Sequence, residues 1–151
     1  MELLYRGTRD GMSSKTFHNN CDNKGPTISL FKNEKGYIFG GYISNDWKGD
    51  QYGGWASAGD SFIFTLTNMY NISPTKFPTS DKTTSIFDNS DYGPNFGNSN
   101  DIFINFNSNN NSINFPNSYK DVLGKGYSIF TGDNENKNFY LEEIEVFKLI
   151  K

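Results

Sequence analysis

The first place where side chains could do chemistry is a pair formed by the single histidine and the single cysteine. His18 precedes Cys21 by three residues, so both side chains lie on one face if the segment is helical. A thiol beside a histidine base is typical of a nucleophile or of a peroxide-reactive cysteine. The competing interpretation, which we favour, makes Cys21 a small buried residue and places His18 on the helix surface, because cysteine is among the residue types most often buried.

The second place is the end of the chain, where acidic and apolar residues alternate. Strict alternation over 140–149 predicts that Glu143 and Glu145 share a face with Leu141 and Phe147. A carboxylate among apolar neighbours needs a cation or hydrogen bonds, because its pKa otherwise rises. Glu143 and Glu145 are therefore weak catalytic candidates, either as proton acceptors or as a carboxylate pair of the glycosidase type.

A structural role for these two carboxylates competes with catalysis and is favoured. The chain has two arginines, Arg6 and Arg9, and both lie near the N-terminus. If the first and last segments are adjacent, an ion pair of arginine with Glu143 or Glu145 would hold them together. A docking contact and a solvent-exposed acidic face are the other two alternatives.

A polar, glycine-rich segment over 45–59 carries both tryptophans of the chain, Trp47 and Trp55. An exposed tryptophan is a common anchor at protein interfaces. A tryptophan in a loop can equally fold back and cover a sheet. The two alternatives are evenly balanced, and the first makes Trp47 and Trp55 partner-binding residues.

Short strands and one helix are predicted to position these side chains. Ser13 or Ser14 caps a helix over 14–21, and residues 9–11 form a turn before it. Strands are predicted over 27–32, 37–44, 61–67, 84–88, 101–106, 127–131 and 139–150. Many short strands without a strand–helix–strand rhythm favour a mostly β, α+β fold: an antiparallel β-sandwich with a few short flanking helices.

The remaining segments are expected to be connections. Residues 71–82 contain two prolines, and residues 107–117 form the stretch of lowest complexity, so both are predicted to be loops. The paired glycines Gly40 and Gly41 lie inside a predicted strand. They indicate a bulge or the close approach of another group.

Composition limits the class of protein. The 151 residues carry a net charge of −3 and 17% aromatic residues, which argues against disorder and against non-specific nucleic-acid binding. The sequence has no apolar run of about 18 residues and no signal-peptide pattern, so we expect a cytoplasmic protein without direct membrane insertion. One histidine and one cysteine do not make a typical metal site, and phosphate-binding and dinucleotide-binding motifs are missing. We therefore expect no metal and no cofactor.

Several motifs taken together resemble the TLDc domain, and they keep their order over nearly the whole chain. They are LYRGTRDGMS at 4–13, FHNNCDNKGPT at 17–27, IFGGY at 38–42, FIFTLTN at 62–68, YGPNFG at 92–97 and EIEVF at 143–147. The positions that match the motifs of the family are Arg9, Asp10, Gly11, Ser13, Gly40, Gly41, Gly93, Gly97, Glu143 and Glu145.

The resemblance implies one TLDc-like domain over 1–151 with a β-sandwich fold. TLDc proteins protect cells against oxidative damage, and several bind and regulate the proton-pumping vacuolar ATPase. The resemblance thus implies a protein-interaction module more than an enzyme, recruited to the membranes of acidic organelles through such a partner. The alternatives are a structural component of a larger assembly, or an enzyme or peroxide scavenger that uses Cys21 or the two glutamates.

Overall fold

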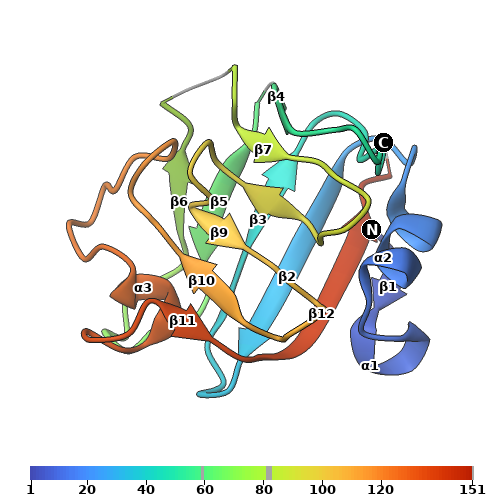
Figure 1. The fold of residues 1–151 in the computed structure, drawn as a ribbon. Coiled ribbons are helices and arrows are strands. Elements are labelled where there is room, and N and C mark those ends of the chain that lie inside the picture. Colours follow the sequence, from blue (N-terminus) through green and yellow to red (C-terminus); the bar gives the residue numbers. More distant parts are fainter. Residues whose placement is uncertain (59, 81–82, 151) are drawn as a thin grey trace.

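Two antiparallel β-sheets lie face to face in the computed structural model, which describes residues 1–58, 60–80 and 83–150 (Figure 1). The first sheet has the order β1-β12-β2-β3-β5-β6, with β1 (Glu2–Arg6), β12 (Leu141–Lys148), β2 (Thr27–Asn33), β3 (Ile38–Ile43), β5 (Phe62–Thr65) and β6 (Thr75–Pro78). The second sheet has the order β11-β10-β9-β8-β7-β4, with β11 (Asn138–Phe139), β10 (Asn111–Ile113), β9 (Ile102–Phe103), β8 (Asn95–Phe96), β7 (Ile86–Phe87) and β4 (Trp55–Ala56). The predicted antiparallel sandwich is confirmed.

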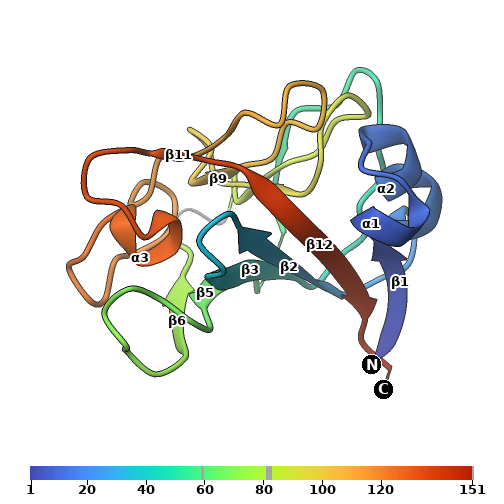
Figure 2. The same ribbon diagram turned by 90° about the horizontal axis from the view of Figure 1, so that it is seen from below.

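Short helices flank the two sheets at opposite edges. Figure 2 shows α1 (Gly7–Asp10) and α2 (Ser14–Cys21) beside β1, and α3 (Ser128–Thr131) near β6. The helix predicted over 14–21 is confirmed, because the Ser13 side chain caps α2 by accepting a hydrogen bond from the Thr16 N–H at 3.2 Å. None of the helices in the described part of the chain is long and apolar enough to cross a membrane.

The first and last strands are neighbours. Strand β12 pairs with β1 on one side and with β2 on the other, and both figures show the two chain ends close together. This arrangement supplies the adjacency that an ion pair between the N-terminal arginines and the closing strand requires. The predicted long strand over 139–150 is divided, because β11 belongs to the second sheet and β12 to the first.

Aromatic side chains fill the space between the sheets. At one end Phe39 packs against Phe130 and Phe139, with ring centroids 5.3 Å apart in both pairs. At the other end Trp47 lies between Phe17 and Phe96, at 5.9 Å from each. These rings are all nearly or fully buried, so aromatic packing joins the sheets and fixes α2 against them.

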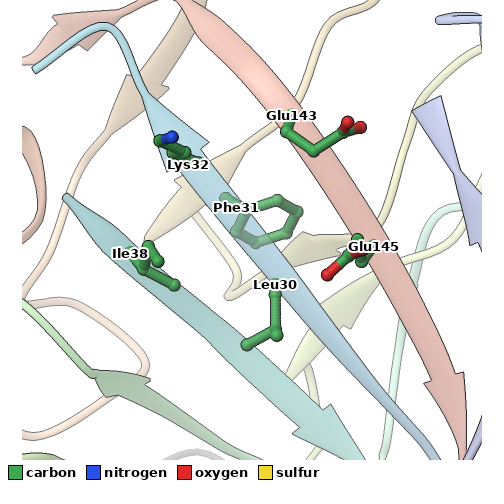
Figure 3. A pocket seen from close by; sticks show the side chains of 6 residues that line it. All are labelled: Leu30, Phe31, Lys32, Ile38, Glu143 and Glu145. Carbon is green, nitrogen blue, oxygen red and sulfur yellow. The ribbon is translucent and has the colours of Figure 1, made fainter. Parts of the chain in front are cut away.

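A bulge in β12 corrects the predicted alternation of the closing strand. The register against β2 shifts between Leu141 and Glu143, so Leu141 faces the core together with Ile144 and Val146. Glu143 and Glu145 lie on the opposite face, which is the outer face of the first sheet (Figure 3). The prediction that they share a face with Leu141 was wrong, because an inserted residue exchanges the two faces of a strand.

Three local predictions were also wrong. Residues 127–131 form the buried helix α3 in place of a strand, and Gly132 ends it with a left-handed φ of 72°. Residues 71–80 contain β6, in which Pro78 is tolerated because β6 is an edge strand, and residues 81–82 of the predicted loop lie outside the described residues. Residues 107–117 contain β10, in which Asn111 and Ile113 are buried. The turn that was predicted over residues 9–11 overlaps the end of α1, and Gly11 is the C-cap residue of this helix.

Candidate functional site

Glu143 caps a helix and is not an unpaired acid. Its carboxylate accepts hydrogen bonds from the backbone N–H of Thr8 at 3.1 Å and from the Thr8 hydroxyl. The Ile144 N–H donates to the same carboxylate at 3.0 Å. The side chain of Arg6, the N-cap residue of α1, makes no capping hydrogen bond, and Glu143 places a negative charge at the N-terminus of this helix from β12, the strand next to β1.

Glu145 forms the expected ion pair with the N-terminal segment. The Arg6 guanidinium lies 2.6 Å from its carboxylate oxygen, and the Arg6 side chain is 42% exposed. We call the residues Arg6, Thr8, Glu143 and Glu145 the N-terminal clasp. Their contacts join the two ends of the chain, as the structural alternative predicted, and these contacts occupy the carboxylates that a catalytic role would need.

Cys21 has the environment of a structural residue. Its side chain is fully buried, and burial raises the pKa of the thiol well above its usual range. A thiol that stays protonated is a poor nucleophile and a poor peroxide sensor. The interpretation of Cys21 as a small buried residue therefore fits the structure, and the catalytic one does not.

His18 is buried among hydrogen-bond acceptors, which corrects its predicted place on the helix surface. Its Nε2 lies 2.9 Å from the carbonyl oxygens of Asn89 and Tyr92, and its Nδ1 lies 2.7 Å from the Asp22 carboxylate. Carbonyl oxygens only accept hydrogen bonds, so Nε2 donates, and a second donation to Asp22 makes the ring an imidazolium. Burial lowers the pKa of His18, but the hydrogen bond and charge of Asp22 and the two carbonyls outweigh it and raise the pKa overall.

A second carboxylate lies close to this cation. Asp88 is nearly buried and accepts hydrogen bonds from the backbone N–H groups of Lys48 at 2.8 Å and Gly49 at 3.0 Å. Burial raises the pKa of Asp88, while these two hydrogen bonds and the His18 charge lower it in part. We call His18, Asp22 and Asp88 the imidazolium cluster. It fastens two loops, 45–54 and 88–93, to helix α2.

The structure separates the two tryptophans. Trp47 is fully buried, so it cannot be an exposed anchor, and the partner-binding prediction for Trp47 is corrected. Its loop folds back because Trp47 packs between Phe17 on α2 and Phe96 on β8, which is the covering role that the sequence left open. Trp55 is 54% exposed on the edge strand β4 and is available to a partner.

Trp55 lies at one end of a row of four aromatic side chains that contact one another and are partly or largely exposed. Its ring lies 5.2 Å from Phe87, Phe87 lies 5.7 Å from Tyr92, and Tyr92 lies 5.3 Å from Phe103. We call these four residues the aromatic ridge. The imidazolium cluster positions the aromatic ridge, because the Tyr92 carbonyl accepts a hydrogen bond from His18. The Asp88 N–H and the Asn89 side-chain amide donate to the carbonyls of the two glycines that precede Trp55.

The N-terminal family positions are structural in their contacts. Arg9 pairs with Asp10 at 2.8 Å on α1, and the hydrogen bonds from Arg9 and from the Arg6 N–H lower the pKa of Asp10 to about 2. The Gly11 carbonyl accepts a hydrogen bond from the Tyr5 hydroxyl at 2.7 Å. Together with the cap at Ser13, these contacts fix the connection between α1 and α2.

The glycines at family positions permit close approaches. A Cβ at Gly40 would lie 1.9 Å from the Ser29 carbonyl oxygen, and one at Gly41 would lie 2.3 Å from the Phe96 ring. Gly41 thus lets the two sheets approach at Phe96, as the paired glycines predicted. A Cβ at Gly93 would meet Phe106 at 2.7 Å, and Gly97 has a φ of +96°.

No catalytic constellation joins the predicted site residues within the described ranges. The clasp, Cys21 and Trp55 lie in separate places, and no group of three or more His, Cys, Asp and Glu side chains there could hold a metal ion. The imidazolium cluster and the aromatic ridge were missed by sequence reasoning. Asp22 is four residues after His18, a helical spacing that could have indicated the pair, whereas Asp88 carries no local signal.

The fold and these contacts define a β-sandwich whose exposed aromatic ridge is fastened by a buried cluster of charges and whose chain ends are joined by a partly exposed ion pair. A model of the TLDc domain family matches residues 1–150. The chain therefore belongs to the TLDc domain family.

A curated relative matches a shorter part of the chain. A segment of 46 residues is 39% identical to the MTOR-associated protein MEAK7 of Danio rerio. The match covers 30% of this chain and 10% of the relative. The activity and partners of that whole protein therefore do not transfer with the match.

Proposed function

We propose that this chain is a docking module that binds the vacuolar ATPase and regulates its assembly or activity, and that it thereby contributes to protection against oxidative stress. The observation that carries the proposal is the TLDc family match over residues 1–150. Its setting would be the cytoplasm, with recruitment to acidic organelles through the pump.

The aromatic ridge supports a docking role and is the surface that we propose to contact the partner. Trp55 is 54% exposed, packs against Phe87 and sits on a strand whose loop is fastened by buried charge. A rigid exposed tryptophan loses little entropy when a partner covers it, so it provides much of the free energy of binding at many interfaces. Trp55 is therefore the proposed partner-binding residue.

A pump assay tests the proposal. Purified protein is added to vacuolar membranes that carry the assembled ATPase, and co-sedimentation and ATP-driven proton pumping are followed together. The wild type should bind and change pumping, and Trp55→Ala should bind roughly 30-fold more weakly. Tyr140→Ala, a control at another exposed aromatic residue, should bind as the wild type does. Absence of wild-type binding, or equal binding by Trp55→Ala, contradicts the proposal.

A second candidate partner follows from the relative. That protein is named as associated with MTOR, and 46 residues of this chain are 39% identical to it. The second proposal is that this chain acts as a component of an MTOR-containing assembly. Co-precipitation with MTOR, in the presence and absence of the vacuolar ATPase, distinguishes the two partners.

A further inference from the structure

The outer face of the first sheet is apolar where a solvent-exposed sheet would be polar. Ile28, Leu30, Ile38, Phe62 and Leu66 are half-buried on this face, and Phe64 is 8% exposed. A hollow of about 360 Å³ lies over β5 and β6. A second hollow of about 100 Å³ on this face is lined by Leu30, Phe31, Ile38, the exposed Lys32 and the two clasp glutamates (Figure 3). An apolar face of this kind is a typical interaction site.

One row of residues crosses this face with opposite charges at its ends. The strand registers align Glu145 with Leu30, Leu30 with Gly40, Gly40 with Phe64, and Phe64 with Lys76. The row therefore runs from Glu145 on β12, whose Oε2 is paired with Arg6 in the clasp, over apolar residues to the exposed Lys76 on β6. Gly40 on β3 is its midpoint, and the Phe64 ring lies over Gly40.

This row is self-complementary. A two-fold axis that is parallel to β3 and lies above Gly40, in the plane between the two copies, places Glu145 of one copy opposite Lys76 of a second copy, and Leu30 opposite Phe64. At the axis, Gly40 is covered by the Phe64 ring of its own copy, so apolar surface lies at the centre of the row. The adjacent row, which contains Ile28 and Tyr42 with Phe62, is apolar and follows the same axis. A surface patch that complements itself in this way fits a symmetric dimer.

We propose that the outer face of the first sheet is a self-association surface at which a second copy of this chain packs face to face. The face spans roughly 20 by 20 Å, from about 4.8 Å per strand and about 3.4 Å per residue. Such a face buries about half of what a standard interface buries on each partner. An interface of this size is in the range of weak, transient association. The proposal is independent of the docking function, because Trp55 lies on the other sheet.

Sedimentation equilibrium of the purified protein from about 10 μM to about 1 mM tests the proposal. The wild type should be a reversible dimer in this range, and Lys76→Glu should raise the Kd roughly tenfold, because two ion pairs per dimer become repulsive. Lys15→Glu on α2 is the matched control, since it reverses an exposed lysine away from this face. It should leave the Kd unchanged.

A charge exchange makes the test specific. Glu145→Lys should also weaken the dimer, and an equimolar mixture of Lys76→Glu with Glu145→Lys should restore association as a heterodimer. Since Glu145→Lys removes the partner of Arg6, its fold is checked by circular dichroism, and Leu30→Ser is the second variant. A wild-type monomer at 1 mM, an unchanged Kd for Lys76→Glu, or a dimer that only Trp55→Ala dissociates overturns the proposal. A monomer would leave the pump-docking proposal standing, because that proposal is tested with Trp55.

Discussion

The N-terminal clasp and the imidazolium cluster both use charge, but they differ in burial. In the clasp, Arg6 is 42% exposed and Glu145 is 25% exposed, so water screens their attraction. In the cluster, His18 is 9% exposed and its partners are backbone carbonyls and a carboxylate. Removing one member of a buried hydrogen-bonded cluster leaves the other polar groups unpaired in the protein interior, where water cannot solvate them. Removing one member of an exposed ion pair leaves the other in contact with water. The same type of contact therefore contributes very differently to stability in the two places.

The largest expected effect is that of His18→Ala. The substitution leaves the Asp22 carboxylate and two backbone carbonyls without their donor, so the free energy of unfolding should fall by about 3 kcal/mol. Urea denaturation followed by fluorescence measures this loss. Asn19→Ala, at the exposed neighbouring position of α2, should cost less than 1 kcal/mol. Equal losses in the two variants would mean that the cluster does not contribute as proposed.

The second prediction concerns pH. Because the pKa of His18 is raised in the folded state, its contribution is fully present below the unfolded value of about 6.5 and disappears as the pH rises through the folded value. The difference in unfolding free energy between the wild type and His18→Gln should therefore shrink as the pH rises above about 6.5. Denaturation curves from pH 6 to 8.5 measure it, and the ionisation of the unfolded cysteine cancels in the comparison because both proteins carry Cys21. A constant difference would show that His18 is not the titrating group.

A smaller effect is expected for Glu143→Ala in the clasp. The variant removes the cap of α1, and the loss of a capping side chain costs about 1 kcal/mol. The unfolding temperature of Glu143→Ala at low salt is compared with that of Glu142→Ala. Glu142 is the residue before Glu143 on β12, and its side chain is exposed. If both variants unfold at the same temperature, the capping contact has no energetic role.

The smallest effect is expected for Arg6→Ala. An exposed ion pair contributes about 0.5 kcal/mol, and salt screens it. The difference in unfolding free energy from the wild type should vanish in 1 M salt, while that of His18→Ala should persist because its charges are buried. If the loss of unfolding free energy in Arg6→Ala does not depend on salt, the clasp stabilises the protein in the same way as the buried imidazolium cluster, and the prediction is wrong.

Much of the fold could be predicted from sequence, because the dominant signals are local. The alternating apolar residues of β2, β3 and β5 and the capping serine of α2 each act within a few residues. The bulge at Leu141 and Glu143 and the helix at 127–131 were missed, because pairing and burial against distant segments decide them.

The site divides in the same way. The ion pair of Arg6 with Glu145 could be anticipated because only two arginines were available. The imidazolium cluster could not, since Asp88 reaches His18 through the folded course of two loops and not through a sequence motif. Trp47 and Trp55 share one loop, and only the structure shows that one is covered and the other exposed.

The position of β12 between β1 and β2 has a consequence for how the protein is made. Arg6 and Glu145 are 139 residues apart in the chain, and β12, the strand that pairs with β1, follows all the other described strands in the sequence. During translation β1 therefore emerges without its pairing strand and remains unpaired until β12 has left the ribosome. The first sheet is thus completed only after the strands of both sheets have been synthesised, and a chaperone that covers β1 until then would favour correct assembly.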